Sequence, residues 1–336
     1  MINKKVDIVL PNRIGDIILT LPAMLCLKQL DAKFASDDIA YRMLTHVPMI
    51  RILDALNLFN VSQINIYLKI KSWINPAEKV FFLSTTNKNL GFHAKTTYGL
   101  QTINKKLLRY SVNMPYLLYP EPSSGMPQEL VIFLRDELHF TKFAIKHFGL
   151  CLELGYTVEQ IRKTFQFDSS SLSFDDNLFD CTPPIAEDYL VFCMEAASGR
   201  KKHNSDRRWK EEHFIDLAEK AHKEYGLIIA FMGLNDQPEL PDKPYFKDFR
   251  GKLDLTQGAQ LLHYSRGYVG NDTGPLHLAN LLKKRSIGMY FREVAVTDYY
   301  PVFPSLNKVF YKPEHPEEIY SALDELIRNS GSREIR

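Results

Sequence analysis

The sequence predicts an α/β fold made of two Rossmann-like domains, whose parallel sheets face a central cleft. Short apolar runs typical of buried strands alternate with segments of helical periodicity along the chain. Serines, acids and a Pro-Pro pair without periodicity interrupt this alternation and indicate a linker at residues 171–187. The 336 residues are long for one domain and comfortable for two. We therefore expect domains at 1–170 and 188–336, with the C-terminal helix as a candidate for packing back on the first domain.

In the first half, a strand at 6–10 precedes a helix at 17–30, with Pro22 expected in or near the first turn. A proline costs little there, because the N–H that it lacks has no helical partner. An amphipathic helix at 142–154 is expected to close the domain. Three further elements are expected between them: strands at 38–44 and 80–83, and a helix at 49–58.

In the second half, the same periodicities predict four strands and four helices. The strands are expected at 189–194, 227–232, 267–269 and 287–291. The helices are expected at 211–225, 254–263, 275–283 and 316–329. This order of strands and helices predicts a second parallel sheet covered by helices.

Composition excludes several classes of protein. The four cysteines form no C-x-x-C pair, which argues against a zinc site or disulfide framework and fits a reducing compartment. The apolar run after the N-terminal lysines is too short for a signal peptide, and no apolar run reaches the roughly 18 residues of a membrane span. We expect a cytoplasmic protein. The net charge of +2 is uninformative, so the distribution of charge matters more.

A Gly-Asp pair lies between the first expected strand and the first expected helix, in the stretch R-I-G-D at 13–16. A carboxylate at a helix start near Arg13 should stay ionised at neutral pH, at the edge of the sheet where α/β proteins bind ligands. Taken alone, Asp16 also fits the simpler role of a helix N-cap.

A second strand–turn–helix segment, Y-V-G-N-D-T-G-P-L-H-L-A-N-L-L, has clearer helix-start signals. Asp272 or Thr273 suits the N-cap, and Gly274-Pro275 suits the first helical positions. Unpaired N–H groups and the helix dipole at such a start can bind phosphate. A well-capped helix without a ligand is the alternative.

Cations dominate the stretch A-A-S-G-R-K-K-H-N-S-D-R-R-W-K, which has only one acid. This excess suggests an anionic ligand such as a diphosphate, although an exposed basic loop is the alternative. The cations are Arg200, Lys201, Lys202, Arg207, Arg208 and Lys210.

Residues 79–120 contain no acid, and aromatic residues are interspersed among their basic ones. A nucleic-acid face, a site for a phosphorylated glycolipid and an anionic membrane surface would each have this composition. Since the chain shows no nucleic-acid motif, we favour the glycolipid or membrane and expect no nucleic-acid partner; chance clustering on a solvated face stays open. The basic residues are Lys79, Lys88, Lys95, Lys105, Lys106 and Arg109.

Three motifs together resemble glycosyltransferase family 9, the ADP-heptose lipopolysaccharide heptosyltransferases and their relatives. They are R-I-G-D-I-I-L-T-L-P-A, the R-R-W after a strand, and G-N-D-T-G-P-L-H-L-A, and F-R-G-K-L-D-L resembles the family's G-K-T-x-L turn. The motifs stand in the family's order over nearly the whole chain. The resemblance implies a GT-B fold, with the acceptor bound by the first domain and the nucleotide sugar by the second. It also implies an inverting reaction that needs neither metal nor cofactor.

The resemblance implies roles for individual residues. Asp16 would be the general base, Asp272 would touch the transferred sugar, and His277 would either pack or contact the ligand. The remaining donor-binding residues would be Arg207, Arg208, Thr273, Gly274 and Ser198 near the phosphates, and Asp236 near the ribose. The phosphates and Kdo carboxylates of a lipopolysaccharide core at the inner membrane would meet Arg13, Lys88, Lys95, Lys105 and Lys106.

Two donor-side segments depart from the family pattern. M-E-A-A-S stands where relatives show H-P-G-A-S, and F-R-E-V where they show F-G-P-T. The expected function is heptose transfer from an ADP-sugar to a lipopolysaccharide core. Because of these departures, another donor such as a UDP-sugar and a non-catalytic protein that binds nucleotide sugar or glycolipid stay open. A Rossmann dehydrogenase is disfavoured, because no G-x-G-x-x-G follows the first strand.

Overall fold

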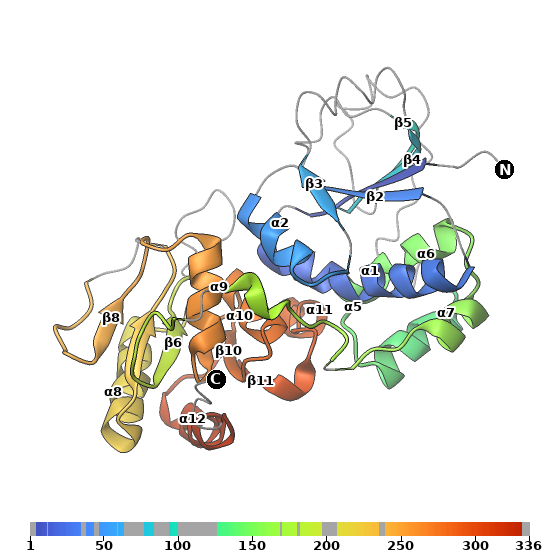
Figure 1. The fold of residues 1–336 in the computed structure, drawn as a ribbon. Coiled ribbons are helices and arrows are strands. Elements are labelled where there is room, and N and C mark those ends of the chain that lie inside the picture. Colours follow the sequence, from blue (N-terminus) through green and yellow to red (C-terminus); the bar gives the residue numbers. More distant parts are fainter. Residues whose placement is uncertain are drawn as a thin grey trace, which may run out of the picture. The chain divides into compact units, whose positions relative to one another are not determined.

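A computed structural model of the chain has two compact units, Met1–Asp175 and Asp176–Arg336 (Figure 1). The structure describes most of the chain, and the two units are treated separately below. The described residues are 5–11, 13–34, 38–43, 47–58, 60–63, 77–83, 94–99, 126–168, 170–179, 182–196, 207–234 and 239–330.

The first unit contains a five-stranded sheet in the order β3-β2-β1-β4-β5, whose strands all run parallel. β1 lies in the middle, paired with β2 on one side and β4 on the other. The strand order therefore reverses between β1 and β4, which is where α/β proteins place ligands. The strands are β1 (Lys5–Val9), β2 (Asp38–Met43), β3 (Val61–Gln63), β4 (Ala77–Phe82) and β5 (Ala94–Gly99).

Helix α1 (Ile14–Phe34) is apolar and buried on every side over residues 17–27, because it packs between the sheet and three further helices (Figure 1). These are α5 (Lys142–His147), α6 (Gly149–Glu153) and α7 (Val158–Thr164). Its first hydrogen bond joins the Ile17 N–H to the Arg13 carbonyl at 2.9 Å, so the helix begins before the predicted residue 17. Pro22 consequently lies in the interior, and its expected place in the first turn is wrong. An interior proline costs about 3 kcal/mol or more, and the burial of residues 17–27 around it offsets that cost.

The other helices of the first unit are short. The single helix predicted at 142–154 is wrong, because the chain forms α5 (Lys142–His147) and α6 (Gly149–Glu153) on either side of Phe148. Here the backbone bonds join residues three apart, Phe148 to Ile145 and Cys151 to Phe148, and Gly149 favours the break. The remaining elements are α2 (Val47–Asp54), α4 (Gln128–Ile132), a π-helical turn (Phe133–Glu137) and α7 (Val158–Thr164).

The second unit contains a parallel sheet of six strands in the order β11-β10-β9-β6-β7-β8. The strand order reverses between β6 and β9, at the centre of the sheet. The prediction of an α/β fold with parallel sheets is confirmed. The strands are β6 (Tyr189–Cys193), β7 (Ile228–Phe231), β8 (Phe246–Asp248), β9 (Tyr268–Asn271), β10 (Ser286–Tyr290) and β11 (Asn307–Tyr311).

Helices cover both faces of this sheet. On one face, α8 (Glu211–Tyr225) and α12 (Glu317–Asn329) pack against β-strand residues such as Phe192 and Phe231 in one apolar cluster. On the other face, the Tyr189 hydroxyl donates to the carbonyl of Leu261 in α9 at 2.7 Å. The remaining elements are α9 (Leu255–Tyr264), α10 (Gly274–Leu281), α11 (Glu293–Asp298) and 3₁₀ turns at Asp176–Leu178 and Pro304–Leu306.

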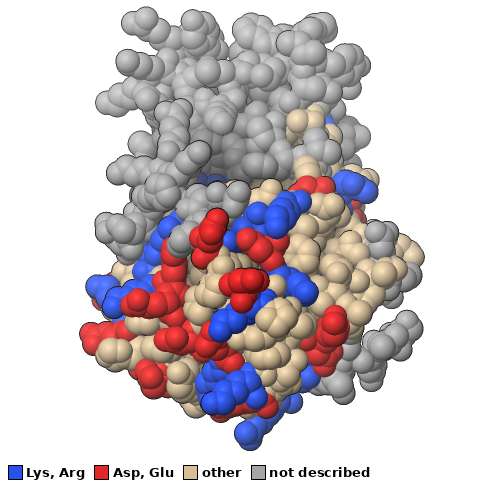
Figure 2. Space-filling view, turned by 90° about the vertical axis from the view of Figure 1, so that its left-hand side faces the viewer, with Lys and Arg blue, Asp and Glu red and all other residues tan. Residues whose placement is uncertain are grey.

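Within the described part of the chain, no helix is long and apolar enough to cross a membrane. The surface of the second unit on the side of α8 and β8 mixes basic and acidic side chains among its described residues (Figure 2). On this face, the described basic and acidic side chains are interspersed and form no large patch of one sign.

Candidate active site

The candidate site lies at the carboxyl ends of β6 and β9, where the strand order of the second unit reverses. The buried amide of Asn271 connects the segments that meet there. Its Nδ2 donates to the Met194 carbonyl at 2.8 Å, and its Oδ1 accepts from the Trp209 N–H at 3.0 Å. Sequence reasoning did not select Asn271, although it stands inside the G-N-D-T-G-P motif.

Trp209 anchors the segment that carries the predicted cations. Its indole is 2% exposed and donates to the Pro313 carbonyl at 2.8 Å. Its ring also meets Phe214 of α8 edge-on, with 5.2 Å between ring centroids. The position of Arg207, two residues away, is therefore fixed by a buried side chain.

Arg207 and Asp272, both selected from the sequence, form an ion pair. The Arg207 Nη2 donates to Asp272 Oδ2 at 2.8 Å and to the Asp272 carbonyl at 2.9 Å. The two side chains are 14% and 10% exposed, so this is a largely buried pair. The structure thus brings the basic segment and the G-N-D-T-G-P turn together at one carboxylate.

Two more cationic or titratable groups surround the same carboxylate. His277 Nε2 lies 3.9 Å from Asp272 Oδ1, and Arg292 Nη2 lies 3.9 Å from Asp272 Oδ2. His277 is buried and belongs to α10, whereas Arg292 follows β10 and is half exposed. Two guanidinium groups beside one carboxylate give this cluster a net positive charge. Sequence reasoning did not select Arg292, and the F-R-E-V departure was its only signal.

Helix α10 begins beside this cluster without a side-chain cap. Thr273 occupies the N-cap position with extended backbone, but its hydroxyl donates instead to the Asn271 carbonyl at 3.3 Å. Gly274 and the following proline form the first helical positions, as expected. The partial positive charge of this helix start adds to that of the guanidinium groups.

Buried groups beneath the turn do not ionise at neutral pH. Burial raises the pKa of the Cys193 thiol and of the Tyr268 phenol. Burial, with the nearby Asp272 carboxylate, also raises the pKa of Tyr290. Cys193 is consequently a poor nucleophile, because the thiolate is the reactive form.

A further acid, Glu195, follows β6 within the M-E-A-A-S departure. Its buried carboxylate accepts the Leu234 N–H at 2.5 Å and so holds the turn after β7. That turn passes through Gly233, whose φ of 131° is a conformation that side chains rarely adopt. Sequence reasoning noted the departure but not this contact.

Other predicted donor-side residues are less informative. Arg208 lies at the start of α8, with its Nη1 4.0 Å from Glu211 Oε1, and is largely buried. Ser198 and Asp236 lie outside the described residues.

In the first unit, Asp16 is the third residue of α1 and is half buried. The Arg13 carbonyl accepts the first helical hydrogen bond, so Asp16 lies inside the first turn and not at the N-cap. An acid is favourable there, because it faces the positive end of the helix dipole. Arg13 itself is exposed. The described part of Lys95 is its backbone in β5, and Lys88, Lys105 and Lys106 lie outside the described residues.

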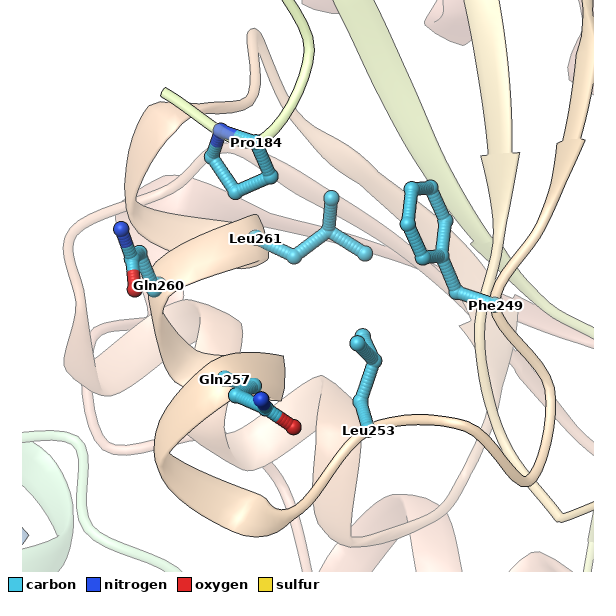
Figure 3. A pocket seen from close by; sticks show the side chains of 6 residues that line it. All are labelled: Pro184, Phe249, Leu253, Gln257, Gln260 and Leu261. Atoms are coloured by element: carbon cyan, nitrogen blue, oxygen red, sulfur yellow. The ribbon is translucent and has the colours of Figure 1, made fainter. Parts of the chain in front are cut away.

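An apolar pocket of about 220 Å³ lies beside the turn between β8 and α9. Figure 3 shows Phe249, Leu253 and Leu261 pointing toward one another, with Gln257 at the side. Two polar contacts lie in the same segment: Asp254 and Gln257 form a reciprocal capping box, and Arg250 donates to both carboxylate oxygens of Asp248 at 2.8 and 2.9 Å. The Arg250 guanidinium holds the pKa of Asp248 below its usual value. Sequence reasoning selected the surrounding F-R-G-K-L-D-L turn without predicting a pocket.

The two parallel sheets and the helices that cover them define an α/β protein, and its fold matches that of GT-B heptosyltransferase structures. Residues 140–301 match the model of glycosyltransferase family 9 (heptosyltransferase), which confirms the resemblance seen in the motifs. This segment is similar to family 9 glycosyltransferases; the match covers a little under half of the chain and supports the prediction of a glycosyltransferase. The R-I-G-D stretch lies before the matched segment. A search of curated proteins finds no match to the sequence.

Solved structures match over nearly the whole chain. E. coli ADP-heptose lipopolysaccharide heptosyltransferase II is 14% identical, with a TM-score of 0.63 and coverage of 98% of this chain and 100% of that one. A family 9 glycosyltransferase from Veillonella parvula DSM 2008 is 15% identical, with a TM-score of 0.64 and 98% coverage of both chains. These likenesses show that the fold is shared.

A third similar structure is TibC of enterotoxigenic E. coli H10407, a dodecameric, iron-containing heptosyltransferase solved with ADP-D-β-D-heptose. It is 11% identical, with a TM-score of 0.52 and coverage of 98% of this chain and 78% of that one. Among the residues described for the present chain, no group of three or more His, Cys, Asp or Glu side chains could hold a metal ion.

Proposed function

We propose that the protein transfers heptose, or a related sugar, from an ADP-sugar to a lipopolysaccharide core acceptor, with inversion and without a metal ion. The cluster of Arg207, Asp272 and Arg292 at the start of α10 is the observation that carries this proposal. It provides fixed positive charge inside the segment that matches family 9. One of the similar proteins is an ADP-heptose lipopolysaccharide heptosyltransferase, and another was solved in complex with ADP-D-β-D-heptose, which supports this donor.

The start of α10 is the proposed site for the diphosphate. A nucleotide diphosphate that leaves the sugar carries developing negative charge, which preorganised donors can stabilise in place of a metal. Arg207, the Thr273-Gly274 turn and the dipole of α10 would supply this stabilisation, with Ser198 as a further phosphate ligand. Arg208 is a proposed donor-side cation, and His277, buried behind Asp272, is proposed to position that carboxylate.

Asp272 has a proposed role distinct from that of the cations. Its carboxylate is held by Arg207 through a 2.8 Å hydrogen bond, which fixes its orientation. A fixed carboxylate can accept hydrogen bonds from hydroxyl groups of the transferred sugar. Asp272 would thus place the anomeric carbon next to the phosphate that leaves it.

The apolar pocket beside α9 is the proposed site for the nucleotide base. Phe249 follows β8 and Asp272 follows β9, so both stand at the carboxyl edge of the same parallel sheet. Three strand spacings of about 4.8 Å separate them by about 14 Å. A nucleoside diphosphate lying along this edge would place its base near Leu253 and its ribose near the proposed contact Asp236.

Asp16 is the proposed general base. It would take the proton from the acceptor hydroxyl as the oxygen forms its bond to the anomeric carbon and the bond to the diphosphate breaks. Such general base catalysis contributes a factor of about 10²–10⁴ in rate. Phosphates and carboxylates of the acceptor, at the inner face of the inner membrane, would be bound by cations of the first unit. These are Arg13, Lys88, Lys95, Lys105 and Lys106.

The test is a thermal-unfolding series of the purified protein with ADP, UDP and GDP. A nucleotide at 100 times its dissociation constant stabilises the native state by about 2.7 kcal/mol, which gives a readable shift. We expect ADP to give the largest shift. A larger shift with UDP would replace the donor, and no shift with any nucleotide would contradict the transferase proposal.

A further inference from the structure

Arg292 is a cation that this chain places where the family pattern F-G-P-T has none. It lies two residues after the end of β10, which pairs with β9 in the sheet. The turns after these two strands therefore lie next to each other at the carboxyl edge. Arg292 thus stands beside the start of α10, in a segment outside the motifs used to select the site.

The two arginines around Asp272 differ in their contacts. Arg207 is 14% exposed and makes two hydrogen bonds to Asp272. The Arg292 side chain is 46% exposed, and its Nη2 lies 3.9 Å from Asp272 Oδ2, beyond hydrogen-bond distance. Asp272 is therefore already satisfied by Arg207, and the donors of Arg292 stay available for an anion that arrives from solvent.

The strand order places Arg292 at one end of the proposed donor. From the base pocket after β8, the edge runs past β7 and β6 to the turn after β9, and β10 follows beyond it. A nucleotide that extends from the pocket to the start of α10 would therefore reach Arg292 with its sugar-proximal part. The negative charge in that part is on the phosphate bonded to the sugar.

We propose that Arg292 binds the sugar-proximal phosphate of the nucleotide sugar and stabilises the charge that develops on it when the sugar leaves. This inference rests on the proposed function. The planar guanidinium of Arg292 can bind two phosphate oxygens at once, and a lysine could not reproduce that geometry. Arg207, bound to Asp272 by two hydrogen bonds, contributes positive charge to the diphosphate site, while Arg292 contacts the sugar-proximal phosphate directly.

The test compares nucleotides with and without the β-phosphate, which is the phosphate bonded to the sugar in a nucleotide sugar. Dissociation constants for ADP and AMP are measured by calorimetry at fixed ionic strength for the wild type, Arg292→Ala and Arg292→Lys. If UDP is the nucleotide that binds, UDP and UMP replace them. We expect Arg292→Ala to weaken ADP about tenfold, equivalent to ~1.4 kcal/mol, and to change AMP less than about twofold. Arg292→Lys should recover part of the loss.

Arg328→Ala is the matched control, because it removes an exposed arginine of α12 in the same unit. It should change the binding of neither nucleotide. Equal weakening of ADP and AMP by Arg292→Ala, or no weakening of ADP, would overturn the assignment while the wild-type affinity for ADP still supports the proposed function. Absence of all nucleotide binding in the wild type would overturn both. Unchanged thermal unfolding of the variants without nucleotide excludes misfolding as the cause.

Discussion

The two units present an aspartate in the same topological place but with different burial and different neighbouring side chains. Asp16 and Asp272 each follow a central strand of a parallel sheet, next to the point where the strand order reverses. Asp272 is 10% exposed and bound by Arg207, with Arg292 nearby. Asp16 is half buried in the first turn of α1. The same topological position thus holds the carboxylate that we propose as general base in one unit and a carboxylate bound to a cation cluster in the other.

The largest expected effect is on the aspartate of the first unit. Asp16→Asn keeps the shape of the side chain but removes the proton acceptor, so the transfer rate should fall about 10²–10⁴-fold, or about 3–5 kcal/mol in barrier. Initial rates with an ADP-sugar and a Kdo-lipid acceptor measure this. The affinity for ADP should stay the same, because the proposed donor site lies in the other unit. A transfer rate of Asp16→Asn within a few-fold of the wild-type rate would contradict the proposal that Asp16 is the general base.

The next effect concerns the ion pair of the second unit. Arg207→Met should lower the free energy of unfolding by about 3 kcal/mol, because it leaves the largely buried Asp272 carboxylate without its main partner. Urea unfolding measures this. The double variant Arg207→Met/Asp272→Asn is the control and should recover part of the loss. An additive loss in the double variant would show that the pair does not couple.

The third prediction concerns how the free energy of unfolding of the first unit depends on pH. His147 is fully buried in α5, and burial, with nearby Lys146, lowers its pKa to about 3. In the unfolded chain a histidine takes up a proton near pH 6.5, whereas in the folded protein His147 is protonated only near pH 3. The free energy of unfolding therefore decreases as the pH falls through this window, by roughly 2–3 kcal/mol between pH 6 and pH 4.

Urea unfolding across this range, compared with His147→Gln, measures the effect on the first unit. The variant should have a flatter pH profile between pH 6 and pH 4. An identical slope in both proteins would assign the acid sensitivity to other groups.

The smallest effect compares two glycines with positive φ. Gly233→Ala should cost about 1–3 kcal/mol, because a Cβ at φ 131° would lie 3.0 Å from the Glu195 carboxylate. Gly155 in the first unit has φ 93° with open space where a Cβ would lie, so Gly155→Ala carries the backbone strain without the contact. Chemical unfolding of both variants measures the difference. Equal costs would mean that the Glu195 contact adds nothing to the strain.

Periodicity and motif order predicted the α/β fold and its parallel sheets, because buried central strands such as β6 are apolar throughout. The edge strands β8 and β11 were missed, since their burial is mixed along their length. Pro22 was misplaced for a different reason: residues 17–27 of α1 are buried on all sides, so packing overrides the preference of proline for a first turn.

For the site, local sequence identified residues that the turn itself brings together, such as Asp272 and Thr273. It also identified Arg207 through the R-R-W motif. The contacts of Asn271, Glu195 and Arg292 were missed, because each depends on a partner from another strand end. Such partners follow from strand order, which periodicity does not give. The roles of Asp16 and of the acceptor-side lysines stay predictions.

The anchoring of Trp209 makes the donor site observable by spectroscopy. The chain has two tryptophans, and Trp209 lies two residues from Arg207, with its backbone tied to Asn271 and its indole to Pro313. A buried indole held by a single hydrogen bond should emit in a narrow band that shifts when the neighbouring segment moves. Replacing Trp73 by Phe would leave one emitter, so that nucleotide binding and release could be timed in the unlabelled protein by stopped-flow fluorescence.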